Sequence, residues 1–270
     1  MLRSMYSGIS GMRGFQTKLD VIGNNIANVN TSGFKKGRVA FQDMMSQTTR
    51  GAQGPTGNRG GINPIQVGLG SKVGSVDNIH TQGFLQTTGN ALDLAIEGNG
   101  MFILSDGQTT YFTRAGNFYL DEEGFIVNAD GYYLIGTDGN RIRIEDNIQS
   151  FSIATDGTVN IVGADGNPNT AGTIALARFS NPAGLEKVGN NLYIDTPNAG
   201  LSRTNDGNIQ YFTPESEGLG KIVASALEMS NVDLAEEFTE MIVAQRGFQA
   251  NTRIITTSDE ILQELVNLKR

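Results

Sequence analysis

The chain contains no cysteine and a single histidine, His80, among its 270 residues. Without cysteine it can form no disulfide, no thiolate metal site and no thiol nucleophile. One histidine cannot build a histidine-based metal site, and a catalytic triad around it would need distant partners, so a packing or surface role is the simpler interpretation. We therefore expect no metal and no cofactor.

The chain also lacks basic clusters and long apolar runs. Its formal net charge is −8 and its pI about 4.7. An acidic chain without a basic stripe is a poor ligand for nucleic acid, because neutralising phosphates supplies most of that affinity. No run of about 18 apolar residues is present, so we expect no membrane insertion. Residues 1–14 lack the apolar centre of a secretory signal peptide, although a dedicated export machine would leave the same trace.

Motifs of catalysis are similarly scarce. The stretch 68–72, GLGSK, lacks the residue order of a phosphate loop, and no stretch fits an EF-hand calcium loop or a G-x-S-x-G elbow. The run Asp121-Glu122-Glu123 stands next to Gly124 and is typical of a solvated hairpin tip. We expect no enzyme. The alternative of a different class is a carbohydrate-binding or hydrolase module that uses carboxylates of a β domain.

Glycine is abundant: it makes up 35 of the 270 residues, or about 13%, whereas the average is about 7%. From about residue 76 to 211, Asx-Gly pairs separate short apolar or alternating runs. Such pairs favour hairpin turns, because these turns need a positive φ. This stretch predicts a compact antiparallel β domain. The pairs are Asn99-Gly100, Asp106-Gly107, Asp130-Gly131, Asp138-Gly139, Asp156-Gly157, Asp165-Gly166 and Asp206-Gly207.

Both ends of the chain show helical spacing instead, with apolar residues every three or four positions. The C-terminal pattern predicts a helix from about Asn231 to Leu268, on the order of 55 Å long, with N-cap side chains at Ser230, Asn231 and Asp233. A helix of that length needs a partner. The residues that we expect to pack between helices and subunits are Leu2, Met5, Ile9, Met12, Leu19, Ile22, Ile26, Leu234, Phe238, Met241, Phe248, Ile255, Leu262 and Leu265.

Gly8, Gly11, Gly14 and Gly23 interrupt the N-terminal pattern. Each interior glycine costs up to about 1 kcal/mol relative to alanine, so we expect this segment to be disordered in the monomer and helical only when packed. An ordinary core helix with close-packed glycines is the alternative.

Together the patterns predict a mainly β chain. A central antiparallel β domain, residues 76–224, is flanked by N- and C-terminal α-helices that pair as a coiled-coil-like module, residues 1–30 and 225–270. An extended connector, residues 31–75, joins them; its stretch 48–71 is rich in Gly, Gln, Asn, Pro and Thr.

Three strings of residues resemble the bacterial flagellar hook and rod (axial) protein family. The first is LDVIGNNIANVNTSGFK over residues 19–35. The second is LEMSNVDL over residues 227–234, continued by EMIVAQR over 240–246. The third is NALDLAIEGNGMF over residues 90–102, followed by TRAGNF over 113–118. The motif residues are Asn24, Asn25, Asn28, Gly33, Phe34, Asn231, Gln245 and Arg246.

The resemblance implies a structural subunit whose terminal helices form an inner tube beneath an outer β domain. It implies export through the flagellar type III apparatus and location in the flagellum outside the cell. The implied partners are further copies of the chain in a helical homopolymer, and neighbouring rod, cap and hook–filament junction proteins.

Two members of the family remain open. The ending LVNL over residues 265–268 is most similar to hook subunits, so the main interpretation is a short hook subunit that couples rod to filament and transmits torque. The segment 47–70 resembles the corresponding connector of the distal rod protein, which is the alternative. Many hook subunits carry an additional outer domain for which this chain has no room.

Overall fold

The computed structural model describes residues 2–55, 57, 59–144, 148–163, 167–204 and 209–268. The chain forms two compact units. The first contains Met1–Ala27, Gly37–Asn78 and Asp233–Arg270, and the second contains Asn28–Lys36 and Ile79–Val232. The chain therefore passes between the units four times.

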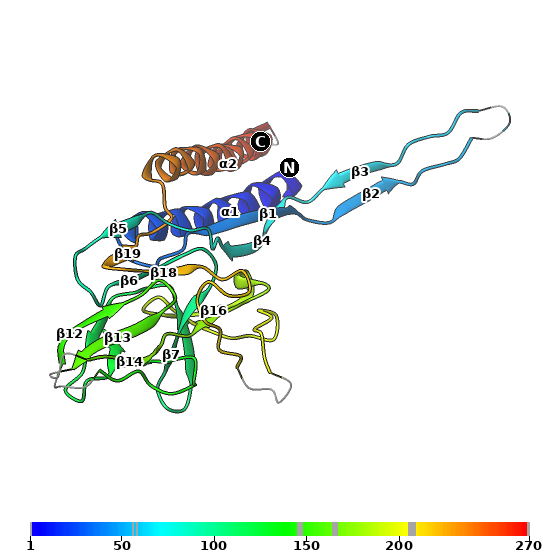
Figure 1. The fold of residues 1–270 in the computed structure, drawn as a ribbon. Coiled ribbons are helices and arrows are strands. Elements are labelled where there is room, and N and C mark those ends of the chain that lie inside the picture. The colour runs from blue at the N-terminus through cyan, green and yellow to red at the C-terminus, as the bar shows by residue number, and fades with distance from the viewer. Residues whose placement is uncertain are drawn as a thin grey trace. The chain divides into compact units, whose positions relative to one another are not determined.

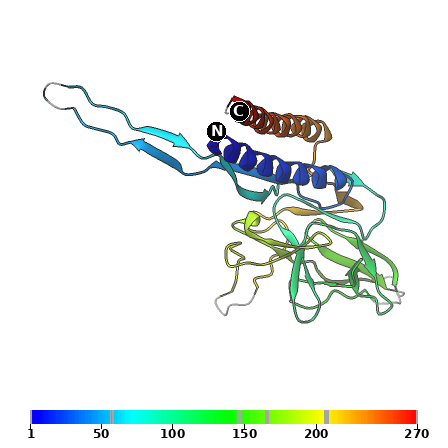
Figure 2. The same cartoon turned by 180° about the vertical axis from the view of Figure 1, so that it is seen from behind.

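Two helices and a strand pair build the first unit (Figures 1 and 2). Helix α1, Leu2–Ala27, and helix α2, Leu234–Leu268, pack along each other. Strands β1, Gly37–Asp43, and β4, Ser71–Asn78, pair antiparallel and pack on α1. Asp233 caps α2, because its Oδ1 accepts hydrogen bonds from the N–H groups of Ala235 and Glu236 at 2.8 and 3.4 Å.

An exposed hairpin extends from this strand pair. Strands β2, Ser46–Arg50, and β3, Ile65–Gly68, pair antiparallel, and a bridge joins Gln53 to Ile62 beyond them. Both views show the hairpin extending away from α1 and α2 (Figures 1 and 2). Of the predicted connector 31–75, residues 37–43 and 71–75 lie in β1 and β4, and residues 46–50 and 65–68 lie in β2 and β3.

The second unit is an antiparallel β structure. Its largest sheet has the order β16-β17-β8-β7-β11-β10-β9, with β15 also paired to β7; β12, β13 and β14 form a second sheet, and β18 pairs with β6 and β19 with β5. A 3₁₀ turn, η1, spans Pro182–Gly184. The strands are β5 Leu85–Thr87, β6 Leu94–Glu97, β7 Met101–Ser105, β8 Thr110–Thr113, β9 Phe118–Leu120, β10 Ile126–Asn128, β11 Tyr133–Leu134, β12 Ile148–Ile153, β13 Thr158–Gly163, β14 Pro168–Thr173, β15 Leu176–Ala177, β16 Glu186–Gly189, β17 Leu192–Ile194, β18 Lys221–Ala224 and β19 Ala226–Glu228.

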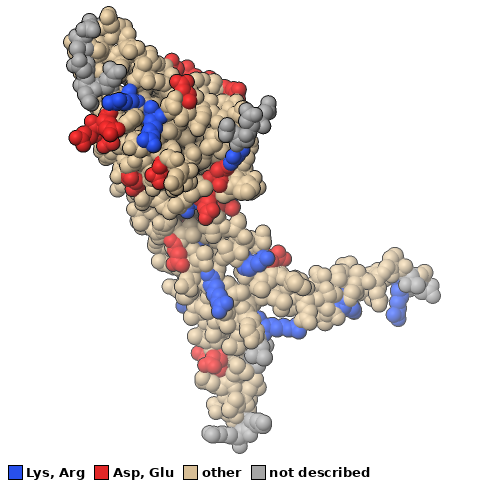
Figure 3. Space-filling view, turned by 90° about the horizontal axis from the view of Figure 1, so that it is seen from below, with Lys and Arg blue, Asp and Glu red and all other residues tan. Residues whose placement is uncertain are grey.

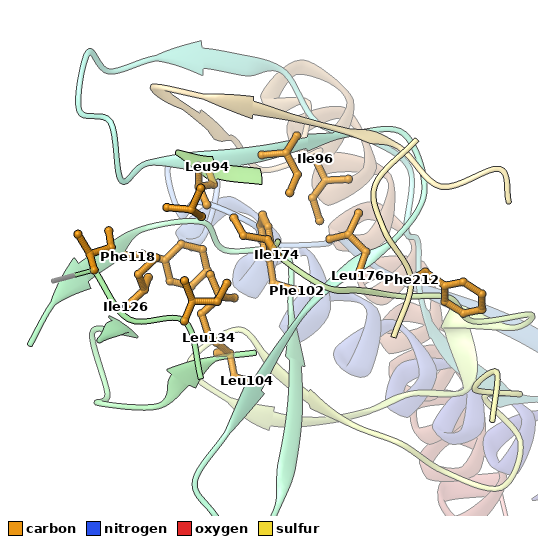
Figure 4. Close-up of a cluster of buried hydrophobic side chains, with 14 of the residues drawn as sticks. Leu94, Ile96, Phe102, Leu104, Phe118, Ile126, Leu134, Ile174, Leu176 and Phe212 are labelled. Carbon is orange, nitrogen blue, oxygen red and sulfur yellow. The ribbon is translucent and has the colours of Figure 1, made fainter. Parts of the chain in front are cut away.

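The core of the second unit consists of the inward-facing apolar residues of these strands (Figure 4). Phe102 and Phe118 meet edge to face with ring centroids 5.3 Å apart. Leu94, Ile96 and Ile174 lie among them and are fully buried. This burial is the main stabilising contribution, at about 25 cal/mol per Å² of apolar surface removed from water.

The structure confirms the mainly β fold with paired terminal helices. Asp106-Gly107 joins β7 to β8, Asp130-Gly131 joins β10 to β11, and Asp156-Gly157 joins β12 to β13, each pair antiparallel. Asn99-Gly100 makes no hairpin, because β6 pairs with β18 rather than with β7. The pairs at 165–166 and 206–207 lie outside the described residues.

Candidate assembly interface

Close-packed glycines bring α1 and α2 together. A Cβ atom at Gly11 would lie 2.7 Å from Asn251 Nδ2, and one at Gly247 would lie 2.6 Å from Cζ of Phe15. At Gly8, the backbone oxygen of Asn251 and Ile255 Cγ1 would both be at 3.5 Å. Glycine at positions 11 and 247 permits an approach that a side chain would obstruct, whereas a Cβ atom at Gly8 would make an ordinary van der Waals contact.

The same helix packs closely on its strand pair. A Cβ atom at Gly14 would lie 2.7 Å from Phe41 Cε1, and the rings of Phe15 and Phe41 are 5.7 Å apart. Gly23 differs, since a Cβ atom there would meet nothing within 4 Å. Two of the four glycines in α1, Gly11 and Gly14, therefore allow close packing, as in the alternative that sequence analysis left open. Gly247, which sequence analysis did not single out, serves the same purpose from α2.

Asn25 ties the end of α1 to both other parts of the unit. Its Oδ1 accepts a hydrogen bond from Gly37 N, and its Nδ2 donates to Gly37 O, both at 2.9 Å. Nδ2 also donates to Glu237 Oε2 of α2 at 3.2 Å. Asn25 is 1% exposed, so all of its polar capacity is spent inside the unit. Asn24, by contrast, is exposed.

Within one copy, most of the residues predicted to pack between helices are only half-buried, and some are exposed. Ile22 is buried. Met5, Ile9, Met12, Leu19, Ile26, Met241, Ile255 and Leu262 are half-buried, and Leu234, Phe238, Phe248 and Leu265 are exposed. Leu2 belongs to α1, but its side chain lies outside the described part. The motif residues Gln245 and Arg246 are exposed on α2.

The apolar surface of α2 is wider than α1 can cover. At about 100° per residue, its apolar positions span roughly three-quarters of the helix circumference. Its described residues that are buried are Glu237, Ala244 and Ser258, near the middle of that arc. On one side lie Phe238 and Ile242, 50% and 54% exposed, and on the other lie Val243 and Ile261. Two apolar flanks thus remain uncovered along the helix.

A buried ion network lies in the second unit. Gly33, with φ +70°, donates its N–H to Glu228 O at 2.8 Å, and Phe34 beside it is 2% exposed. Lys35 Nζ then donates to Glu228 Oε1 at 2.6 Å, and Arg114 Nη1 donates to Glu228 Oε2 at 3.1 Å. The motif ending Gly33-Phe34-Lys35 is therefore anchored on β19.

The remaining donors of the network are also satisfied. Lys35 donates to Thr81 O at 2.8 Å, and Arg114 Nη2 donates to Gly98 O at 2.6 Å. Burial lowers the pKa of Lys35, while Glu228 raises it. The network therefore places the Glu228 carboxyl group between the Lys35 and Arg114 side chains.

Asn231 joins three segments close to where the chain leaves this unit. Its Oδ1 accepts from Lys36 N at 2.8 Å, and its Nδ2 donates to Ile79 O at 2.8 Å and to Thr81 Oγ1 at 3.0 Å. In the turn that directly follows α1, Asn28 Oδ1 accepts a hydrogen bond from Thr31 Oγ1 at 3.2 Å. The motif asparagines are therefore hydrogen-bonded to backbone and side chains where the chain changes direction.

His80 packs beside this network, with its ring 5.5 Å from that of Tyr193. Burial, together with the nearby cations Lys35, Arg114 and Lys187, lowers the pKa of His80 to about 4. The imidazole is thus neutral at pH 7. Within the described residues, neither ring nitrogen has a hydrogen-bond partner.

The described residues show neither a metal-binding cluster nor a membrane-spanning helix. Across the described residues, no three or more His, Asp or Glu side chains gather in a group that could hold a metal ion. None of the described helices has the length and apolar character needed to cross a membrane.

Three family models match the chain. The model described as "Flagella basal body rod protein" matches residues 5–35, "Flagellar hook protein FlgE/F/G D1 domain" matches residues 95–161, and "Flagellar basal body rod FlgEFG protein C-terminal" matches residues 223–268. The matches include the ends of the chain and a large part of the β unit.

Individual relatives extend over the full length. The chain is 56% identical over 270 residues to the flagellar basal-body rod protein FlgG of Bacillus subtilis (strain 168), covering all of both chains. It is 39% identical over 276 residues to the flagellar basal-body rod protein FlgG of Borreliella burgdorferi, again covering all of both. It is 32% identical to the flagellar hook protein FlgE of the same organism, over an alignment of 448 positions covering all of both.

Proposed function

The chain belongs to the family of flagellar hook and basal-body rod proteins, and on this premise we propose that it is the subunit of the distal rod of the flagellar basal body. Its relatives are structural flagellar proteins rather than enzymes, and the chain is accordingly a structural protein of the bacterial flagellum. The distal rod was the alternative interpretation in sequence analysis, behind the hook.

Full-length similarity carries this proposal. The rod protein of Bacillus subtilis aligns with all 270 residues at 56% identity. The hook protein of Borreliella burgdorferi needs 448 aligned positions, so it contains sequence that the present chain lacks. The hook-like ending at residues 265–268 covers four positions, and the full-length similarity outweighs it.

A second observation in support of the rod proposal concerns the hairpin of β2 and β3 with its tip, residues 44–70, which we call the arm. Residues 44–70 contain Arg50 and Arg59 but no acidic residue, while the whole chain has net charge −8. Figure 3 likewise shows Lys and Arg but no Asp or Glu on this projecting arm. An isolated two-stranded hairpin is marginally stable in water. We propose that the arm lies against acidic surface of adjacent copies and stiffens the polymer.

Assembly then follows from the uncovered flanks of α2. Each flank is apolar and accessible in a single copy, and fully burying one Leu, Ile or Phe side chain stabilises by about 1.5–3 kcal/mol. Neighbouring copies that cover these flanks would form a tube of helix pairs. Contacts between unlike surfaces extend as an open helical polymer when the rotation between copies does not close into a ring. We propose the predicted packing residues on α1 and α2 as this contact surface.

The proposed partners are therefore other copies of the chain, together with the axial proteins at each end of the rod. Export through the flagellar type III apparatus completes this proposal. It requires the helical unit to unfold readily, in keeping with the glycines of α1.

Deleting the gene in its host and imaging the purified basal bodies tests the assignment. We expect a rod that stops short and carries no hook, with motility lost. A complete rod without the curved extension would instead identify the hook subunit. Intact basal bodies and normal motility would contradict both. Expression of the wild-type chain from a plasmid should restore the rod and is the control.

A further inference from the structure

Exposed apolar surface is concentrated on two elements of the first unit, the arm and helix α2. Together they carry most of the large hydrophobic side chains that are exposed in the described part of the chain. Among the described residues, the second unit contributes only Phe84, Tyr119, Leu120 and Val188, which come from three separate segments. A continuous apolar surface on a single copy marks an interaction site. The arm and α2 are therefore the two candidates for such a site.

The arm has one apolar face and one polar face. Ile65 and Val67, 48% and 40% exposed, alternate along β3 and therefore point to the same side. A bulge in β2 brings Arg50 opposite Ile65, so its side chain belongs to that side too. Thr48 and Gln66 pair on the other side, where Gln66 Nε2 donates to Thr48 Oγ1 at 3.3 Å. The arm thus presents aliphatic side chains and an arginine on one face only.

Four aliphatic side chains form a row along α2: Val243, Ile254, Ile261 and Leu265. Nearly whole numbers of helical turns separate successive members, so the four lie on one narrow stripe of the helix. They are between 42% and 54% exposed and belong to one of the two uncovered flanks. The row is about 33 Å long at 1.5 Å per residue. Residues 62–69 of the arm extend over about 23 Å at 3.3 Å per residue, so the row can receive them.

The two surfaces also differ in charge. Helix α2 contains six acidic and two basic residues, whereas the arm contains Arg50 and Arg59 and no acidic residue. Glu264 is exposed and stands three residues beyond Ile261, so it borders the row. Arg50 holds the corresponding position beside Ile65 on the arm. Helix α2 therefore offers the arm both an apolar surface and the opposite charge.

We propose that the apolar face of the arm of one copy packs on the aliphatic row of α2 in a neighbouring copy, with Arg50 toward the acidic side chains of that helix. Within one copy the arm extends away from α2, so its own row is out of reach (Figures 1 and 2). The contact rests on the proposed polymeric function and names the surface that receives the arm.

Such a contact has two consequences for the polymer. The arm and the row are different surfaces of one chain, so each copy donates one arm and receives another, and the contact can continue from copy to copy. A hairpin that is marginal by itself gains a support for its apolar face. The flank of α2 with Phe238 and Ile242 remains for packing between helices.

Photo-crosslinking identifies the surface that the arm contacts without assuming a register. The chromosomal gene is altered so that the photo-reactive residue p-benzoylphenylalanine replaces Val67, and isolated basal bodies are irradiated. We expect a covalent dimer of the chain in which the cross-linked peptide, identified by mass spectrometry, comes from α2. The matched control carries the same residue in place of Gln66, the neighbour on the polar face, and should give much less of this product.

The outcomes separate this contact from the proposed function. A product at position 67 that joins the arm to the second unit, or to a different protein, would overturn the contact while leaving the rod assignment in place. Equal cross-linking to α2 from positions 66 and 67 would overturn it as well. Basal bodies that contain none of the wild-type chain would instead refute the proposed function itself.

Cysteine substitution decides the question if the larger photo-reactive residue blocks assembly. Val67→Cys combined with Ile254→Cys or with Ile261→Cys introduces the only thiols in the chain, which has no cysteine of its own. Oxidised basal bodies should give a ladder of dimers and higher species on a non-reducing gel, because each copy then carries one thiol on each surface. Gln66→Cys with the same partners should give no ladder. Absence of a ladder from both Val67 pairs, or an equal ladder from the Gln66 pairs, would contradict the contact.

Discussion

Glu228 accepts a hydrogen bond from Lys35 at 2.6 Å although 193 residues separate them, and both side chains are fully buried. Arg114 donates to the other carboxylate oxygen. The contact connects the end of the N-terminal motif to the strand that precedes α2. Its partners come from three distant parts of the chain, so the β unit must be largely folded before the network can form.

The first prediction concerns this network. Glu228→Gln leaves two cations in the interior without a counter-charge, and we expect it to lower the free energy of unfolding by about 3–5 kcal/mol. Urea denaturation of the full chain, followed by tyrosine fluorescence, measures the change. Glu97→Gln is the control, because its ion pair with Lys221 is about half exposed and should contribute at most about 1 kcal/mol. Equal effects of the two variants would contradict the network's role.

The second prediction separates the glycines of the helical unit. Gly247→Ala places a methyl group 2.6 Å from the ring of Phe15, so the Phe15 ring or helix α2 must shift, at a cost of about 1–3 kcal/mol. Gly23→Ala meets nothing within 4 Å and should stabilise α1 by up to about 1 kcal/mol. The thermal midpoint of the helical circular dichroism signal should move down in the first variant and up in the second. A higher midpoint in both variants would show that helix propensity alone governs the stability of this unit.

The third prediction concerns the uncovered flank of α2. Phe238→Asp changes a side chain that is 50% exposed, so we expect the stability of the monomer to change by about 0.5 kcal/mol or less. Polymer formation should fail, because a charge would be buried between copies. Thr239→Asp, on the polar side of the same turn, is the matched control and should still assemble. Sedimentation and electron microscopy distinguish the two, and normal polymers of Phe238→Asp would exclude this flank from the interface.

The fourth prediction is a pH dependence that originates at His80. Its pKa is about 4 in the folded chain and about 6.5 when unfolded. Well above pH 6.5 the imidazole is neutral in both the folded and the unfolded state, so its titration does not change the free energy of unfolding. As the pH falls from 6.5 to 4, the unfolded chain binds a proton that the folded chain does not, so stability falls, by up to about 3 kcal/mol.

Comparing the wild type with His80→Gln isolates this effect. Urea denaturation at several values of pH should show a smaller loss of stability between pH 6.5 and 4 in the variant. The groups around the ring are Lys35, Arg114, Lys187 and Glu228, and all remain in the variant. Parallel curves for the two proteins would place the pH dependence elsewhere.

Structural elements that depend on neighbouring residues were predicted well from the sequence. Helical spacing marked both terminal helices, and Asp-Gly pairs marked three hairpins, because periodicity and a positive φ are properties of a few consecutive residues. Asn99-Gly100 shows the limit. Its dipeptide fits a turn, but β6 takes β18 as its partner from more than 120 positions along the chain. Strand pairing is decided by competition among all available edges, and no local pattern records it.

The sequence by itself determined the class of the protein: a β unit between two helical ends, with family motifs and without the cysteine that thiol chemistry requires. The tertiary structure alone decided what those residues do. It showed that Gly11 and Gly14 serve close packing and that Lys35 pairs with Glu228. It also showed that α2 keeps two apolar flanks uncovered. Local propensity acts over a few bonds, whereas burial and ion pairing depend on which distant segments meet, and that is settled only when the whole chain is packed.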